Sequence, residues 1–239
     1  MLRRMKASDT AQLQTYLESR TEDIDTEIIA KVSAILQDVK ARRDEAVKAY
    51  TRQFDGIELD DFRVSPCDIE AAAAKAEPFF VESMKKAKAN IEYYHTAQKQ
   101  NGYLLQKEMG IYMGQRVLPL DSVGIYVPGG RAQYPSSVLM NAIPARIAGV
   151  KRIVMITPPA QDGSLHPNIA AAAMIAGVDE IYKVGGAQGI AALAYGTESI
   201  APVDKIVGPG NVFVAAAKKL VLGKVDIDMI AGPREILVI

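Results

Sequence analysis

Three glycine-rich turns are the positions in this sequence whose residue types best fit the binding of a ligand. They lie at 128–130 (PGG), 185–189 (GGAQG) and 208–211 (GPGN), each between an expected strand and an expected helix. The free N–H groups at the start of a helix and its dipole favour an anion such as a pyrophosphate. A single turn of this kind could simply be a tight connection, but three together favour a phosphate-bearing ligand.

Two amides and one aromatic residue adjoin these turns. Gln188 and Asn211 could hydrogen-bond a ribose, a phosphate or a carboxamide, although Asn211 could equally cap a helix. Tyr126 could stack on or hydrogen-bond a cofactor, but an aromatic residue in a strand is more often part of the core. The GxGxxG fingerprint is absent, and the second strand ends in Thr157-Pro158 instead of an acidic residue for ribose hydroxyls. Spacing alone therefore does not identify NAD.

Other catalytic chemistry finds little support in the residue types. His95 and His166 have no partners at metal-ligand spacing, and neither makes a convincing general base. Cys67 is better explained as a small buried side chain or a helix N-terminal residue than as a nucleophile. We therefore assign no catalytic residue and no metal ligand to this chain.

The alternation of strands and helices that positions the turns begins near residue 120. Strands are expected at 123–127, 152–157, 180–184, 204–207 and 236–239, and helices near 136–149, 167–177, 187–199 and 210–222. Strict alternation predicts an α/β fold, with a Rossmann-like parallel sheet covered on both faces. Ligands of such sheets bind beyond the carboxyl ends of the strands, which is where the three turns fall.

A helical region with a β-hairpin precedes the sheet. Helical periodicity predicts one helix from about 25 to 54, and Pro78 suits the first turn of a later one. Segments 103–108 and 111–118 read as the two strands of the hairpin. The apolar run 236–239 has no polar tail after it, so we expect a longer chain in which the first domain is completed. This gives three parts: 1–120 in an incomplete first domain, 121–233 as the Rossmann-like domain, and 234–239 as the strand that returns.

Composition sets the remaining bounds. The 239 residues are 49% hydrophobic, with 28 basic and 28 acidic side chains, so charge gives no reason to expect nucleic acid or an anionic membrane as a partner. A single cysteine fits a reducing cytoplasm. No uncharged apolar run is long enough to span a bilayer, so a soluble protein is expected.

Four segments in order closely resemble the histidinol dehydrogenase family. They are VGIYVPGGRAQYPSSVLMNAIPARIAGV, VGGAQGIAALAYGT, VDKIVGPGN and VDIDMIAGP, supported by YTRQFDG and YYHTAQK earlier in the chain. The resemblance implies a zinc-dependent, homodimeric enzyme of histidine biosynthesis that oxidises L-histidinol through the aldehyde to L-histidine and reduces two NAD. It implies NAD contacts at Tyr126, Gln188 and Asn211. The family's zinc ligands and its Glu–His acid/base pair would lie beyond Ile239.

One position departs from the family pattern. After IDxxAGP the family has serine or threonine, a substrate-binding hydroxyl, whereas this sequence has Arg234. A long cation in that place favours either an anionic alcohol as substrate, as for relatives that act on sulfonated diols, or an arginine that turns to solvent. We favour histidinol. The alternatives are a relative with another substrate, a non-catalytic nucleotide-binding fragment, and an enzyme acting on a sugar phosphate.

Overall fold

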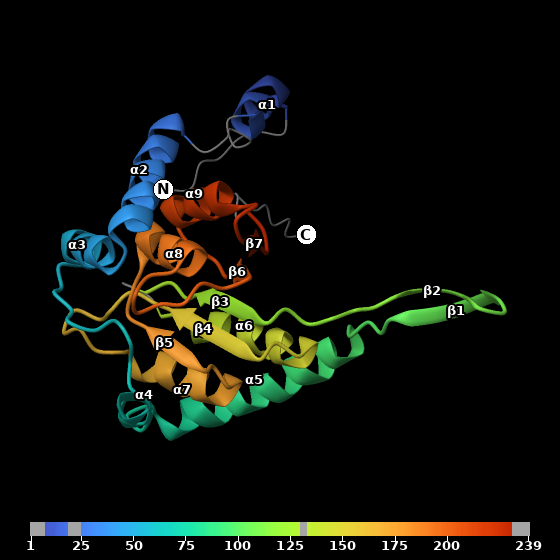
Figure 1. Cartoon of the computed structure of the whole chain (residues 1–239). Helices are drawn as coiled ribbons and strands as arrows, with labels where there is room; N and C mark the ends of the chain where they lie inside the picture. The colour runs from blue at the N-terminus through green and yellow to red at the C-terminus, as the bar shows by residue number, and fades with distance from the viewer. Residues whose placement is uncertain (1–7, 19–24, 130–132, 231–239) are drawn as a thin grey trace.

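The fold is built around a five-stranded parallel sheet (Figure 1). The computed structural model describes residues 8–18, 25–129 and 133–230. The sheet strands are β3 (Ser122–Tyr126), β4 (Arg152–Ile156), β5 (Glu180–Tyr182), β6 (Lys205–Val207) and β7 (Asp226–Ile227). Their spatial order is β5-β4-β3-β6-β7, so the chain winds outward from β3 in both directions. This is the doubly wound arrangement that the alternating pattern predicts, with its switch point between β3 and β6.

Helices cover both faces of the sheet. On one face, α6 (Pro135–Ala148) and α7 (Pro167–Ala176) pack with the preceding α4 (Pro66–Ala73) and α5 (Pro78–Ala97). On the other face lie α8 (Gly186–Tyr195), α9 (Val212–Val221), α2 (Thr26–Arg42) and α3 (Asp44–Asp55). A further helix, α1, spans Thr10–Glu18.

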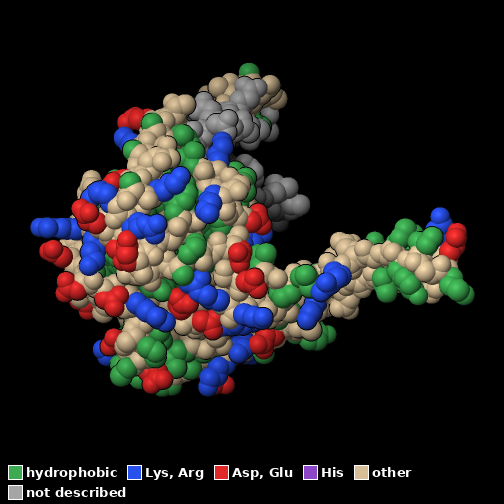
Figure 2. All heavy atoms as spheres, in the orientation of Figure 1, with side chains coloured by type: hydrophobic (Ala, Val, Ile, Leu, Met, Phe, Trp, Pro, Cys, Tyr) green, Lys and Arg blue, Asp and Glu red, His purple; other side chains and the backbone are tan. Residues whose placement is uncertain are grey.

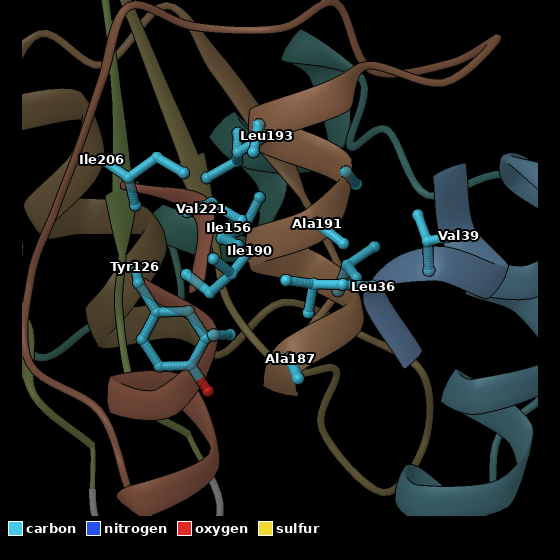
Figure 3. Close-up of a cluster of buried hydrophobic side chains, with 14 of the residues drawn as sticks. Leu36, Val39, Tyr126, Ile156, Ala187, Ile190, Ala191, Leu193, Ile206 and Val221 are labelled. Carbon is cyan, nitrogen blue, oxygen red and sulfur yellow. The ribbon is translucent and has the colours of Figure 1, made fainter. Parts of the chain in front are cut away.

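The strand β3 is buried on both sides because each face meets a different hydrophobic cluster. Val123 and Ile125 join the cluster of α6 and α7, whereas Tyr126 points into the cluster of α8 (Figure 3). Gly124 lies opposite Leu193, and a Cβ there would come within 2.8 Å of the leucine side chain. The missing side chain lets α8 pack closely on the sheet, and each buried Leu or Ile contributes about 1.5–3 kcal/mol.

The predicted helix over 25–54 is wrong in one respect, because two helices occupy that stretch. Arg43 separates α2 from α3 with φ of 52°, which is costly for a residue other than glycine. The loop after α8 supports the break: the Glu198 carboxylate accepts from the Asp44 N–H at 3.0 Å, and Ser199 Oγ donates to the Asp44 carboxylate at 2.5 Å. The bend directs α3 against α8.

The hairpin is confirmed, although its second strand ends earlier than expected. It consists of β1 (Tyr103–Glu108) and β2 (Ile111–Gln115), paired antiparallel. Every residue of both strands is exposed, and the pair projects from the body as a long arm (Figure 1). The strand β7 was not predicted from the sequence, and the expected strand at 236–239 lies outside the described residues.

Candidate functional site

The carboxyl ends of the sheet strands border a cleft of about 880 Å³. One wall comes from the turns after β3, β4, β5 and β6, and the opposite wall from α2 and the end of α3. Its polar and aromatic lining includes Lys31, Tyr50, Phe54, Asp55, Tyr126, Gln188, Asn211 and Phe213. The size is that of a cofactor or substrate pocket, and three side chains singled out from the sequence meet in it.

Tyr126 belongs to both the core and the cleft. Its side chain is 4% exposed, and the Gly186 N–H donates to its hydroxyl oxygen at 3.3 Å. Burial raises the pKa of Tyr126, as does the negative charge of Asp55, while the bond from Gly186 lowers it. The phenol therefore stays protonated at neutral pH. Since its oxygen already accepts a hydrogen bond, its own O–H proton can be donated to a ligand.

Gln188 lies in the first turn of α8 and is 1% exposed. Its Oε1 atom is buried and has no hydrogen-bond partner. A buried amide oxygen without a partner costs about 1–3 kcal/mol, so such atoms are rare in folded proteins unless something binds them. The amide lies over Gly186, where a Cβ would come within 2.4 Å of Oε1.

Asn211 caps α9, as one of the two sequence-based interpretations predicted. Its Oδ1 accepts from the N–H groups of Phe213 at 3.0 Å and Val214 at 3.1 Å. Capping uses the oxygen and leaves the Nδ2 group as a donor. Asn211 is exposed in the cleft lining, so both interpretations are compatible with its position.

A buried lysine holds the turn that carries Asn211. Lys218, 3% exposed, donates from Nζ to the Gly208 carbonyl at 3.0 Å and pairs with the Asp228 carboxylate. Asp228 in turn accepts from the Gly208 N–H at 2.9 Å. Gly208 has φ of +111°, and a Cβ there would lie 2.2 Å from the Tyr126 carbonyl oxygen. The turn after β6 is thus fixed from both sides and passes directly over the end of β3.

Asp55 is a residue of the cleft that the sequence analysis missed. It is the last residue of α3, its Oδ2 atom is buried without a hydrogen-bond partner, and burial raises the pKa of its carboxyl. Tyr50 and Phe54 stack beside it, with ring centroids 5.7 Å apart and planes 12° apart. The sequence feature that could have identified Asp55 is an acidic residue at the C-terminus of a helix, where the helix dipole disfavours a negative charge.

The chain matches known proteins along most of its length. A sequence profile described as histidinol dehydrogenase matches residues 18–239. The chain belongs to the histidinol dehydrogenase family. Histidinol dehydrogenase from Listeria innocua is 59% identical over 213 residues, which cover 89% of this chain and 50% of the relative. That from Methanothermobacter thermautotrophicus is 50% identical over 239 residues, covering all of this chain and 56% of the relative.

The structure of histidinol dehydrogenase from Elizabethkingia anophelis resembles this fold, with a TM-score of 0.84 and 40% identity. The match covers 90% of this chain and 50% of that one. The chain thus spans about half the length of these histidinol dehydrogenase relatives. Arg234, the departure from the family pattern, lies outside the described residues.

Neither histidine lines the cleft in this member of the histidinol dehydrogenase family, and Cys67 does not line it either. His166 caps α7, its Nδ1 accepting from the Asn168 N–H at 3.2 Å. His95 Nδ1 is 2.7 Å from Gln98 Oε1 near the end of α5, and Cys67 is exposed in the first turn of α4. Within the described ranges, no group of three His, Cys, Asp or Glu side chains could hold a metal ion.

Proposed function

We propose that this chain supplies the NAD-binding part of a histidinol dehydrogenase, an oxidoreductase of histidine biosynthesis that converts L-histidinol to L-histidine. The observation that carries the proposal is the cleft in which Tyr126, Gln188 and Asn211 converge, with a buried Gln188 oxygen left without a partner. A carboxamide or hydroxyl of the cofactor would satisfy that oxygen. We assign cofactor binding to these three residues.

When bound, NAD accepts the hydride from the alcohol. The residues of this chain would bind and orient it: Tyr126 donates its O–H, Asn211 donates from Nδ2, and Gln188 accepts at Oε1. The turn after β5 is held close to the turn after β4, because Gly185 faces Pro158 and a Cβ there would lie within 2.6 Å of the proline ring.

Among the described residues, no group of His, Cys, Asp or Glu side chains fits a zinc ion. We therefore expect the 239-residue chain alone to produce no NADH from histidinol. The assay is zinc-dependent NADH formation by the purified chain, and measurable turnover would contradict this assignment.

NAD binding is tested by NMR titration of the 239-residue chain. We expect binding no tighter than roughly millimolar, or about −4 kcal/mol, with shifts at Tyr126, Gln188 and Asn211. Asn211→Ser is the informative variant, because serine is also a good N-cap and keeps α9 capped while the amide is lost. Weaker NAD binding at unchanged stability supports the proposal. Unchanged NAD binding would mean that Asn211 acts only as the N-cap of α9.

We also propose that the complete protein is a homodimer and that the projecting arm takes part in its assembly. Apolar side chains gather on the arm (Figure 2), among them Leu104, Leu105, Met109 and Met113, which are 51–96% exposed. Exposed apolar surface and unpaired strand edges favour association. Light scattering that shows a stable monomer at micromolar concentration would count against this proposal.

We also propose a cytoplasmic location for the protein. We further propose that the chain has three parts, which are residues 1–120, 121–233 and 234–239. No helix in the described part of the chain is long and apolar enough to cross a membrane.

Arg234 favours a second candidate substrate, an anionic alcohol, because a cation replaces the family's hydroxyl at this position. Comparing turnover of histidinol and of a sulfonated diol by the complete enzyme separates the two substrates.

A further inference from the structure

Asp55 occupies a costly position that the fold does not explain. Its Oδ2 atom is buried and has no hydrogen-bond partner among the described residues, and burial raises the pKa of the carboxyl. Burying a charge without a partner is unfavourable, and a carboxylate at a helix C-terminus also meets the negative end of the dipole. Proteins keep such unfavourable groups mainly where function requires them.

A structural role at the end of α3 is already filled by the next residue. Gly56 adopts the left-handed conformation, with φ of 72°, and its N–H donates to the Arg52 carbonyl at 3.2 Å. This is the usual glycine termination of a helix and needs nothing from the preceding side chain. The Asp55 carboxylate is therefore free to act in the cleft.

The surroundings of Asp55 suit a nucleoside. A carboxylate only accepts hydrogen bonds, so its natural ligands here are hydroxyl or N–H donors. Phe54, 53% exposed, and Phe213, 39% exposed, line the same cleft and offer ring faces to a flat base. A ribose diol joined to a base combines both features.

The strand that normally carries the ribose-binding acid lacks one here. In doubly wound dinucleotide sheets, an Asp or Glu after the second strand accepts from the ribose 2′-hydroxyl. In this chain β4 is followed by Thr157 and Pro158. Thr157 is 3% exposed, and Pro158 packs against Gly129 and Gly185. The carboxylate that faces the cleft comes instead from α3, which precedes the sheet in the sequence.

We propose that Asp55 accepts hydrogen bonds from a ribose diol of NAD and disfavours NADP, because its negative charge repels a 2′-phosphate. The inference rests on the proposed function as an NAD-binding chain and assigns the residue that selects the cofactor. It makes α3 part of the cofactor site.

The test compares NAD and NADP binding to the 239-residue chain by parallel NMR titrations. The variants are Asp55→Asn, Asp55→Glu and the control Asp60→Asn, which removes an exposed carboxylate outside the cleft. We expect the native chain to prefer NAD by about tenfold or more, the loss of one charge-assisted hydrogen bond being worth roughly that factor. Asp55→Asn should abolish the preference, Asp55→Glu should keep it in part, and Asp60→Asn should match the native chain.

Urea unfolding of the same variants separates binding from structure. If Asp55 serves the ligand, Asp55→Asn should be at least as stable as the native chain while binding NAD about tenfold more weakly. An unchanged NAD-to-NADP ratio in Asp55→Asn, or loss of binding only together with loss of stability, would overturn the inference but leave the NAD site in place. A native chain that binds neither nucleotide would overturn the proposed function and this inference together.

Discussion

Replacing Lys218 with methionine should destabilise the fold and loosen the turn that presents Asn211. Lys218 is buried beneath this turn, where its ammonium group bonds the Gly208 carbonyl and the Asp228 carboxylate. Methionine has a similar length and fills much of the same space, so the change removes charge and hydrogen bonds more than volume. It leaves Asp228 with its backbone donors only.

The magnitude follows from how deeply each partner is buried. Removing one member of a buried ion pair costs about 3–5 kcal/mol, but the Asp228 side chain is 29% exposed and water can compensate part of the loss. We expect a loss of about 2–3 kcal/mol in the free energy of unfolding. For a chain of this size that corresponds to a decrease of roughly 4–12 °C in Tm.

Lys205→Met provides the matched control. Lys205 pairs with Asp226 at 2.7 Å on the neighbouring strands β6 and β7, with side chains 30% and 59% exposed. A pair this open to solvent is worth about 0–1 kcal/mol. Urea unfolding of both variants, with matched m-values, tests the reasoning. Equal losses, or a loss below about 1 kcal/mol for Lys218→Met, would refute the view that the buried pair fixes the turn.

Three further substitutions test other features of the chain. Gly208→Ala should cost about 3 kcal/mol or more, measured by urea unfolding, because its φ is positive and the new Cβ would meet the Tyr126 carbonyl. Asp55→Asn should stabilise the chain at neutral pH and lose this advantage in acid. The pKa of Asp55 is raised in the folded chain, so the free-energy cost of its charge grows as pH rises above about 3.8 and disappears below that pH. Thermal melts of both versions from pH 3 to 7 would show this change. In a complete chain, Arg234→Ser should raise kcat/KM for histidinol by about tenfold, or 1.4 kcal/mol, because a guanidinium repels the substrate ammonium. Equal kcat/KM values for the two versions would mean that Arg234 faces away from the substrate.

The parts of the fold set by local sequence were predictable. Alternating strands and helices, and glycines at the strand ends, predicted β3 to β6 and the edge at which Tyr126, Gln188 and Asn211 meet. The hairpin followed from a glycine between two apolar runs. The assignment of NAD contacts to particular residues came from the family resemblance and stays a prediction.

The features missed depend on contacts between distant segments. The break at Arg43 is supported by Glu198 and Ser199, more than 150 positions along the chain, which no local pattern reports. Asp55 reaches the cleft from the end of α3, the helix that begins at that break and packs against α8. The strand β7 has two residues, too few to produce a periodicity.

The projecting arm divides the chain into two thermodynamic units. A lone two-stranded hairpin is marginally stable in water, and both strands of this one are exposed along their whole length. Folding of the body is a unimolecular process and does not change with dilution. The order of the arm depends on whatever packs against it, so its equilibrium shifts with the concentration of that partner. Dilution would therefore release the arm while the sheet and its cleft remain intact.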